Sequence, residues 1–351
     1  MSTFDRIRQH KRLYPDANQA VVHTIDLHTA GEPLRVILDG FPELPGSDVL
    51  TRRNRCKKDF DHLRTSLMWE PRGHADMYGC VLTPPNDPTA DFGIVFMHND
   101  GYSTMCGHAI IAITRLADAL GWKDRQDNGE LQLVIDTPCG RIRSSLHEQN
   151  QPFPIHFLGV PSFVVTSNEK LEIPGVGRIY YDLAFGGAFY AYVDADQLSL
   201  DLEPGNYREI ITRGMQIKNL VKAQNQSIRH PFESELSFLY GTIFISEQAS
   251  GHAESRNVCV FADGEVDRSP TGSGASGRMA IHYHRNQIDI RQKMTIESII
   301  GTTFRASVDS VEDYGPYQAV IPKVEGDASI TGEHTFIIDS SDPLHTGFFL
   351  R

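Results

Sequence analysis

Two short segments of this sequence combine side chains that can move protons with glycines that expose backbone N–H groups. They are residues 103–109 (STMCGHA) and residues 269–275 (SPTGSGA). Each follows an apolar, strand-like run and begins a helix-like run, so the sequence predicts the same turn built twice. The first turn carries the Cys106 thiol where the second carries the Thr271 hydroxyl. A thiol acts as a base near neutral pH once its pKa is lowered, whereas a threonine hydroxyl does not do so unaided.

The glycines and the helix starts predict a site for an anion. The first N–H groups of a helix lack internal partners and carry partial positive charge, so they bind carboxylates or phosphates. Glycine lets a ligand approach the backbone closely. A free thiol has a pKa of about 8.5, which a helix N-terminus lowers. We therefore expect Cys106 to be a base or a nucleophile, the alternative being a small buried hydrophobic residue.

Residues around the two turns add further candidates. His108 could contribute its backbone N–H or its ring, and Asp267 could hold an ammonium group or cap the turn. Because Cys106 and His108 are two residues apart at a helix start, we expect their side chains to diverge, which disfavours a Cys–His hydrolase. Cys56 lies among four basic residues and is expected to be a surface thiol. Burial is expected for the cysteines in or beside apolar runs, namely Cys80, Cys139 and Cys259.

Length, charge and cysteine usage limit the class of protein. The chain has 351 residues, enough for two domains with cores of their own. Its net charge of −12 argues against nucleic acid or an anionic membrane as the main partner. The five cysteines are scattered without a C-x-x-C pair, the N-terminus is polar, and no apolar run reaches the ~20 residues of a membrane-spanning helix. We expect a cytoplasmic protein with reduced thiols.

No motif in the sequence calls for a metal or an organic cofactor. His and Cys residues lack zinc-type spacing, and there is no phosphate-binding loop. His282 and His284, two residues apart on a helix, would not point at one ion. Residues 272–277 (GSGASG) lack the acidic residue and the spacing of a dinucleotide fingerprint.

Hydrophobic periodicity predicts an α/β (α+β) protein of two similar halves. Helices are expected at 54–63, at 108–120 with a stop at Gly121, and at about 274–285. Residues 1–20 are interpreted as a polar lead-in, and the Pro- and Gly-rich stretch 151–161 marks a boundary. Strands are expected at 21–27, 34–38, 92–97, 131–135, 189–193, 242–245, 258–261, 319–321 and 335–338. Because each half has one of the two turns, we expect two α/β lobes that face each other.

Residues 105–109 and 267–274 resemble the two site motifs of the proline racemase family. Further stretches agree in order, namely 26–33 (DLHTAGEP), 70–79 (EPRGHADMYG), 256–258 (RNV), 342–343 (DP) and 347–348 (GF). The resemblance runs from about residue 21 to the C-terminus. It implies the fold of diaminopimelate epimerase: two pseudo-symmetric lobes with the active site in the cleft between them. The Cys106 lobe would comprise 21–155 plus 337–351, the Thr271 lobe would comprise 160–336, and the protein would be a homodimer.

The same resemblance suggests an activity. Racemases and 4-hydroxyproline epimerases of this family place one cysteine on each face of the substrate Cα, and this sequence has Thr271 instead of the second. Members with threonine there dehydrate trans-3-hydroxy-L-proline to Δ1-pyrroline-2-carboxylate without a cofactor. In that substrate the hydroxyl lies on the same ring face as the Cα hydrogen. A single thiol, Cys106, is therefore enough for syn elimination, whereas inversion needs two acids.

The resemblance also assigns binding roles. Asp267 would meet the ring ammonium of the substrate, and Thr271 would fill the place of the second cysteine. Backbone N–H groups would hold the substrate carboxylate and stabilise the charge that builds up on it as Cα loses its proton; they belong to Gly107, His108, Gly272 and Ser273. The alternatives are a 4-hydroxyproline epimerase or proline racemase, and a non-catalytic protein that binds imino acids.

Overall fold

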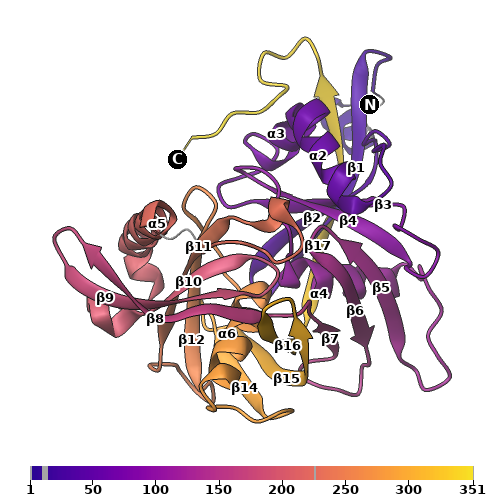
Figure 1. Ribbon diagram of the computed structural model, residues 1–351. Coiled ribbons are helices and arrows are strands. Elements are labelled where there is room, and N and C mark those ends of the chain that lie inside the picture. The colour runs from indigo at the N-terminus through magenta and orange to yellow at the C-terminus, as the bar shows by residue number, and fades with distance from the viewer. Residues whose placement is uncertain (1, 10–14, 225–226, 351) are drawn as a thin grey trace.

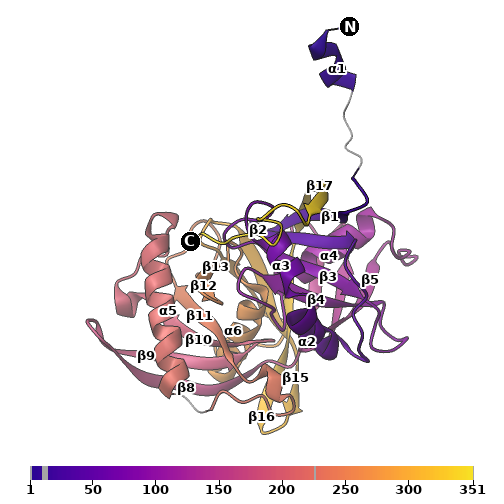
Figure 2. The same cartoon turned by 90° about the horizontal axis from the view of Figure 1, so that it is seen from above.

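The protein consists of two α/β lobes, each a curved sheet around one central helix (Figures 1 and 2). The computed structural model describes residues 2–9, 15–224 and 227–350. The central helices are α4 (Gly107–Ala119) and α6 (Gly272–His284), and the first ten residues of α6 are all buried. A helix with no extended polar face is stable only when other elements enclose it. The two-lobed α/β architecture expected from the sequence is therefore confirmed.

The first lobe encloses α4 between strands on several sides. Strands β2 and β3, like β4 and β5, pair in parallel, and the other neighbours pair antiparallel. Helix α1 (Thr3–Gln9) comes first in the chain, and none of its residues is buried. The elements of this lobe are β1 (Gln19–Thr29), β2 (Glu32–Asp39), α2 (Val49–Asp59), α3 (Asp61–Met68), β3 (Tyr78–Thr83), β4 (Phe92–His98), β5 (Leu131–Thr137), β6 (Gly140–Leu146) and β7 (Ile155–Leu158).

The second lobe repeats this plan around α6. Strand β10 pairs in parallel with β11, and the long helix α5 crosses between them on the outside (Figure 1). Its elements are β8 (Phe163–Ile173), β9 (Gly177–Phe185), β10 (Phe189–Asp194), α5 (Tyr207–Gln224), β11 (Leu239–Ser246), β12 (Ser255–Phe261), β13 (Glu265–Val266), β14 (Lys293–Glu297), β15 (Thr303–Tyr314) and β16 (Tyr317–Gly326). Three short 3₁₀ helices complete it: Ala195–Leu198, Pro204–Asn206 and Ser234–Leu236.

Two strand pairings connect the lobes. Strand β7 pairs with β6 on one side and with β16 of the second lobe on the other. The last strand, β17 (Ala328–Asp339), leaves the second lobe and pairs antiparallel with β1, with Ala328 opposite Thr29. The division into 21–155 plus 337–351 and 160–336 stays a prediction.

Most of the predicted elements are present, with two corrections. The helix expected at 54–63 is two helices, α2 and α3, because the chain leaves helical geometry at Phe60 (φ −129°, ψ 16°). The supposed lead-in 1–20 includes the exposed helix α1 and the start of β1, and its residues 1 and 10–14 lie outside the described part. Helix α5 and strands β3, β6, β7, β8, β9, β13, β14 and β15 were not predicted. Within the described residues, no helix is both long and apolar enough to cross a membrane.

The central helices of the two lobes touch at their N-termini. A Cβ atom on Gly107 would lie 2.6 Å from the Cα of Gly272, and one on Gly272 would lie 2.7 Å from the Cα of Gly107. Real Cβ atoms do not come so close to backbone, so both positions need glycine. The ring of Phe157, on β7, packs against the same point, 2.9 Å and 3.4 Å from those two Cβ positions. The lobes are thus joined backbone to backbone where the two motifs meet.

We predict that Gly272→Ala destabilises the protein by about 1–3 kcal/mol, the usual cost of forcing an extra methyl group into a packed interior. Urea unfolding measures the change. Gly205→Ala is the matched control, since a Cβ there would meet nothing within 4 Å. Equal unfolding midpoints for Gly272→Ala and the control would contradict the close contact between the helix starts.

Candidate active site

A small cavity lies where the starts of α4 and α6 meet. All seven site residues expected from the sequence line it: Cys106, Gly107, His108, Asp267, Thr271, Gly272 and Ser273. Its other lining residues are Met105, Cys259 and four aromatic residues. The cavity leaves only about 20 Å³ for the centres of water molecules, room for about one of them. Tyr240 also lines a wider cleft of about 730 Å³. The lobes are therefore closed around the motif residues.

Cys106 is the N-cap residue of α4. Its backbone is extended (φ −147°, ψ 102°), and its sulfur accepts the N–H of Ala109 at 3.4 Å. The same sulfur lies 3.1 Å from Nδ1 of His108. The expectation that these two side chains diverge is therefore wrong. It assumed helical geometry at both positions, whereas an extended N-cap folds its side chain back over the first turn.

Burial controls the protonation of this pair. It raises the pKa of the Cys106 thiol well above its usual range; Asp267 and Glu32 add to the shift, and the Ala109 N–H only partly opposes it. The lowering of this pKa expected from the helix start is thus outweighed in the closed cavity. Burial also lowers the pKa of His108 to about 3, so its ring is neutral near pH 7. The protonated thiol and the neutral imidazole are hydrogen-bonded, and the imidazole tautomer sets which of the two donates.

Thr271 begins α6 in a strained conformation. Its φ of +65° lies in the left-handed region, which is costly for a β-branched residue. Its side chain is 5% exposed, and its hydroxyl has no partner in hydrogen-bond geometry. That hydroxyl is nevertheless near enough to Asp267 and Cys259 to lower the pKa of both. The next residue but one, Ser273, bonds through its hydroxyl to Tyr190 at 2.8 Å.

Buried acidic groups surround the second turn. Burial raises the pKa of Asp267 to about 6, although its Oδ1 accepts the N–H of Ser269 at 2.7 Å. Glu32, on β2, is fully buried, and burial together with Asp267 raises its pKa well above the usual range. Its Oε2 accepts the N–H of Arg268 at 2.8 Å. The Arg268 side chain reaches Asp76 of the first lobe at 3.4 Å, so this cluster ties the lobes together beside the cavity.

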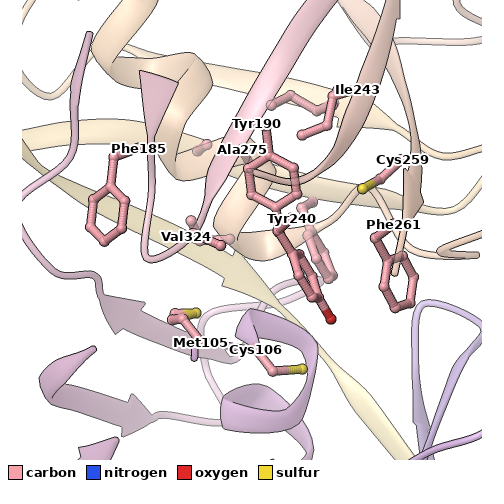
Figure 3. Close-up of a cluster of buried hydrophobic side chains, with 14 of the residues drawn as sticks. Met105, Cys106, Phe185, Tyr190, Tyr240, Ile243, Cys259, Phe261, Ala275 and Val324 are labelled. Atoms are coloured by element: carbon pink, nitrogen blue, oxygen red, sulfur yellow. The ribbon is translucent and has the colours of Figure 1, made fainter. Parts of the chain in front are cut away.

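Aromatic side chains form the remaining wall of the cavity (Figure 3). Tyr78, Tyr190, Tyr240 and Phe261 come from β3, β10, β11 and β12, and Tyr78 bonds to the hydroxyl of Ser103. Sequence reasoning missed all four, and also Glu32 and Arg268 as members of the site. Tyr190, Tyr240 and Phe261 belong to or adjoin ordinary strand patterns, so only the fold brings them together. Glu32 and Tyr78 had a signal, since they lie in the family-like stretches 26–33 and 70–79.

The remaining cysteines are buried and unpaired. Burial of Cys80, Cys139 and Cys259 is confirmed. The expectation that Cys56 is a surface thiol is wrong, because α2 turns Val49 and Cys56 toward the sheet and leaves Lys57 and Lys58 exposed. Among the described residues, no group of three or more His, Cys, Asp or Glu side chains is placed to hold a metal ion.

The fold and the site define a two-lobed α/β protein in which a thiol and two helix starts surround one closed cavity. The chain belongs to the proline racemase family, whose model, described as "Proline racemase", matches residues 24–349. The resemblance expected from the motifs is confirmed.

Named relatives are similar over nearly the whole chain. Trans-3-hydroxy-L-proline dehydratase of Colwellia psychrerythraea is 46% identical over 332 residues, covering 94% of this chain and 93% of that protein. The human protein of the same name is 40% identical over 347 residues, covering 97% and 98%. A crystal structure of a hydroxyproline epimerase from Agrobacterium vitis, with bound trans-4-hydroxy-L-proline, is 28% identical with a TM-score of 0.86, covering 94% and 96%.

Proposed function

We propose that this protein is a hydro-lyase that dehydrates trans-3-hydroxy-L-proline to Δ1-pyrroline-2-carboxylate and water without a cofactor. The observation that carries the proposal is the pair of residues at the two helix starts, Cys106 on one and Thr271 on the other. The two relatives at 46% and 40% identity support it, since both are trans-3-hydroxy-L-proline dehydratases. The family resemblance further suggests a homodimer in the cytoplasm, and five free cysteines are compatible with a reducing compartment.

The substrate would be held by its two charged groups. The N–H groups in the first turns of α4 and α6 suit the carboxylate, because a helix leaves these donors unpaired. Asp267 suits the ring ammonium. Asp267 is also one of the groups that raise the pKa of Cys106, so an ammonium beside it reduces the cost of forming the thiolate. Substrate binding would thus help to create the base that the reaction needs.

The elimination would then take place on one face of the ring. The Cys106 thiolate takes the Cα proton, and the electron pair of that C–H bond forms the Cα–C3 double bond. The C3–O bond breaks, and the hydroxyl leaves as water after receiving a proton. The helix-start N–H groups stabilise the negative charge that develops on the carboxylate. The enamine that is formed tautomerises to Δ1-pyrroline-2-carboxylate.

One observation favours an epimerase as the second candidate. Cys259, on β12, lines the same cavity on the side of Thr271 and is a second thiol there. It is fully buried, and burial raises its pKa well above the usual range. The similar structure of a hydroxyproline epimerase belongs to the same fold. The dehydratase assignment therefore needs an assay that detects inversion as well as elimination.

We predict that the purified protein releases a pyrroline from trans-3-hydroxy-L-proline, measured with o-aminobenzaldehyde. Cys106→Ser should reduce kcat by about 10³-fold or more, because an alcohol is a far weaker base than a thiol. Cys139→Ser is the matched control: that thiol lies outside the cavity, 3.3 Å from the Thr137 hydroxyl, and the change should leave kcat near wild type. The dehydratase proposal fails if no pyrroline is formed and trans-4-hydroxy-L-proline is inverted instead.

We predict that kcat/KM for this substrate falls about tenfold per pH unit below pH about 6. The cause is Asp267, whose raised pKa of about 6 leaves it neutral at lower pH and unable to pair with the ring ammonium. Above that pH the carboxylate is charged and the contribution of Asp267 ends; a further rise of kcat/KM with pH would report the Cys106 thiol, whose pKa burial raises. The Asp267→Asn variant should have a low kcat/KM at every pH, and its kcat/KM should not fall further below pH about 6. If kcat/KM of Asp267→Asn still falls tenfold per pH unit below pH about 6, a group other than Asp267 causes the fall.

We predict that Thr271→Cys gains inversion of trans-4-hydroxy-L-proline, detected by chiral chromatography. The new thiol would supply a proton on the face opposite Cys106, and cysteine is not β-branched, so it tolerates the positive φ at this position better than threonine. Thr271→Ser, which keeps a hydroxyl, is the matched control and should give no inversion. If Thr271→Cys also gives none, the missing thiol is not what prevents inversion.

A further inference from the structure

Tyr240, on β11, keeps a buried hydroxyl without a partner. The residue is 7% exposed, and its hydroxyl oxygen makes no hydrogen bond that satisfies normal geometry. Buried hydroxyl groups are rarely left unpaired, since losing water without gaining a partner costs stability. No group of the described protein accepts from this hydroxyl in normal hydrogen-bond geometry, although Tyr78 lies near enough to lower its pKa.

The unpaired hydroxyl of Tyr240 points toward the active-site cavity. Figure 3 shows the oxygen of Tyr240 directed toward the sulfur of Cys106, and both residues line the cavity. The ring is fixed by its neighbours: it stacks on Phe261 with centroids 5.4 Å apart and meets the edges of Tyr190 and His98 at 5.8 Å and 6.0 Å. A ring enclosed on these sides cannot swing its hydroxyl elsewhere without moving the wall.

This hydroxyl is a proton donor at neutral pH. Burial raises the pKa of Tyr240 well above its usual range, and Glu265 and Cys106 raise it further. Tyr78 is near both groups, since hydrogen bonding with Tyr78 lowers the pKa of the Tyr240 hydroxyl and that of the Cys106 thiol. Cys106 raises the pKa of Tyr240 more than Cys259 does, so the Tyr240 hydroxyl lies nearer to the Cys106 thiol than to the other thiol of the cavity.

Resting on the dehydratase function proposed above, we propose that Tyr240 is the catalytic acid that protonates the departing 3-hydroxyl group. The substrate has three polar groups, and two have partners: the carboxylate at the helix starts and the ammonium at Asp267. The third is the 3-hydroxyl, which lies on the same ring face as the Cα hydrogen and hence faces Cys106. Tyr240 is an unpartnered donor on that side.

All proton transfers of the proposed reaction take place between the substrate and side chains of the cavity. Cys106 as thiolate receives the Cα proton, and the C–H electron pair becomes the new double bond. As the C3–O bond breaks, its electron pair stays on oxygen, and the Tyr240 hydroxyl gives that oxygen a proton, so water leaves. The proton on the Cys106 thiol then passes through Tyr78 to the Tyr240 oxygen. The protein thus returns to the form in which the reaction began, with a Cys106 thiolate and a neutral Tyr240, and one water and one enamine have been formed.

The test is Tyr240→Phe, which removes only the oxygen. Dehydration of trans-3-hydroxy-L-proline should fall about 10²-fold or more in kcat, in the range for loss of a general acid. Elimination of fluoride from trans-3-fluoro-L-proline should stay within about tenfold of wild type, because fluoride leaves without needing a full proton. The melting temperature should be unchanged or higher, since the lost hydroxyl was unpaired.

Tyr102→Phe is the matched control. It also removes a buried tyrosine hydroxyl without a partner, but Tyr102 lines the wider cleft and not the cavity. It should leave both eliminations near wild type.

Three results would overturn the assignment of Tyr240. Unchanged kcat on the hydroxyl substrate would mean that the Cys106 thiol protonates the leaving group directly. Equal losses on both substrates, or a Tyr240→Phe variant that does not fold, would mean that the hydroxyl is structural. These results differ from failure of the dehydratase function itself, in which the wild-type protein forms no pyrroline from trans-3-hydroxy-L-proline.

Discussion

The contact between Gly107 and Gly272 is the constraint on which the rest of the structure depends. It brings the starts of two central helices together with no side chain between them, so their unpaired N–H groups converge on one point. That geometry is possible only if each helix is surrounded by its own curved sheet, and small residues in α6 allow the sheet to close in. A Cβ on Gly277, for example, would lie 2.2 Å from the Tyr192 hydroxyl. The residue just before each glycine, Cys106 or Thr271, is then held beside the same point, where the two helix starts meet.

The closed cavity sets a second condition, because it removes water from charged groups before any substrate is present. Burial raises the pKa of Cys106, Asp267 and Glu32 and lowers that of His108, so each shift favours the neutral form. Under the proposed function, the ammonium of a zwitterionic substrate would favour an ionised Asp267, and its carboxylate would meet the helix starts. The burial that suppresses the thiolate would then make formation of the thiolate depend on the substrate. The cavity has room for about one water, so the lobes must part for a substrate to enter.

The sequence was informative wherever a feature is local. Glycines after a strand-like run and before an apolar helix predicted both helix starts, and the seven residues chosen from them line one cavity. Prediction from the sequence failed where packing between distant elements determines which residues are buried. Four basic neighbours suggested an exposed Cys56, but the buried face of α2 is set by the sheet beneath it. The contact of Cys106 with His108 depends on the extended N-cap conformation, and the strong burial of the thiol depends on the second lobe. The aromatic wall comes from four strands and has no motif of its own.

The near symmetry of the scaffold explains why few side chains can change the reaction. Two equivalent helix starts would hold a substrate carboxylate in the same way whatever lies on either side, so the backbone alone favours neither elimination nor inversion. Inversion requires a proton donor on each face of Cα, whereas syn elimination requires a base and an acid on one face. In this chain the Cys106 side has the thiol and the unpartnered hydroxyl of Tyr240, while the other helix start has the strained Thr271. These side chains differ between the two faces, although the two helix starts are alike. This difference is the physical reason to expect elimination of water and not inversion at Cα.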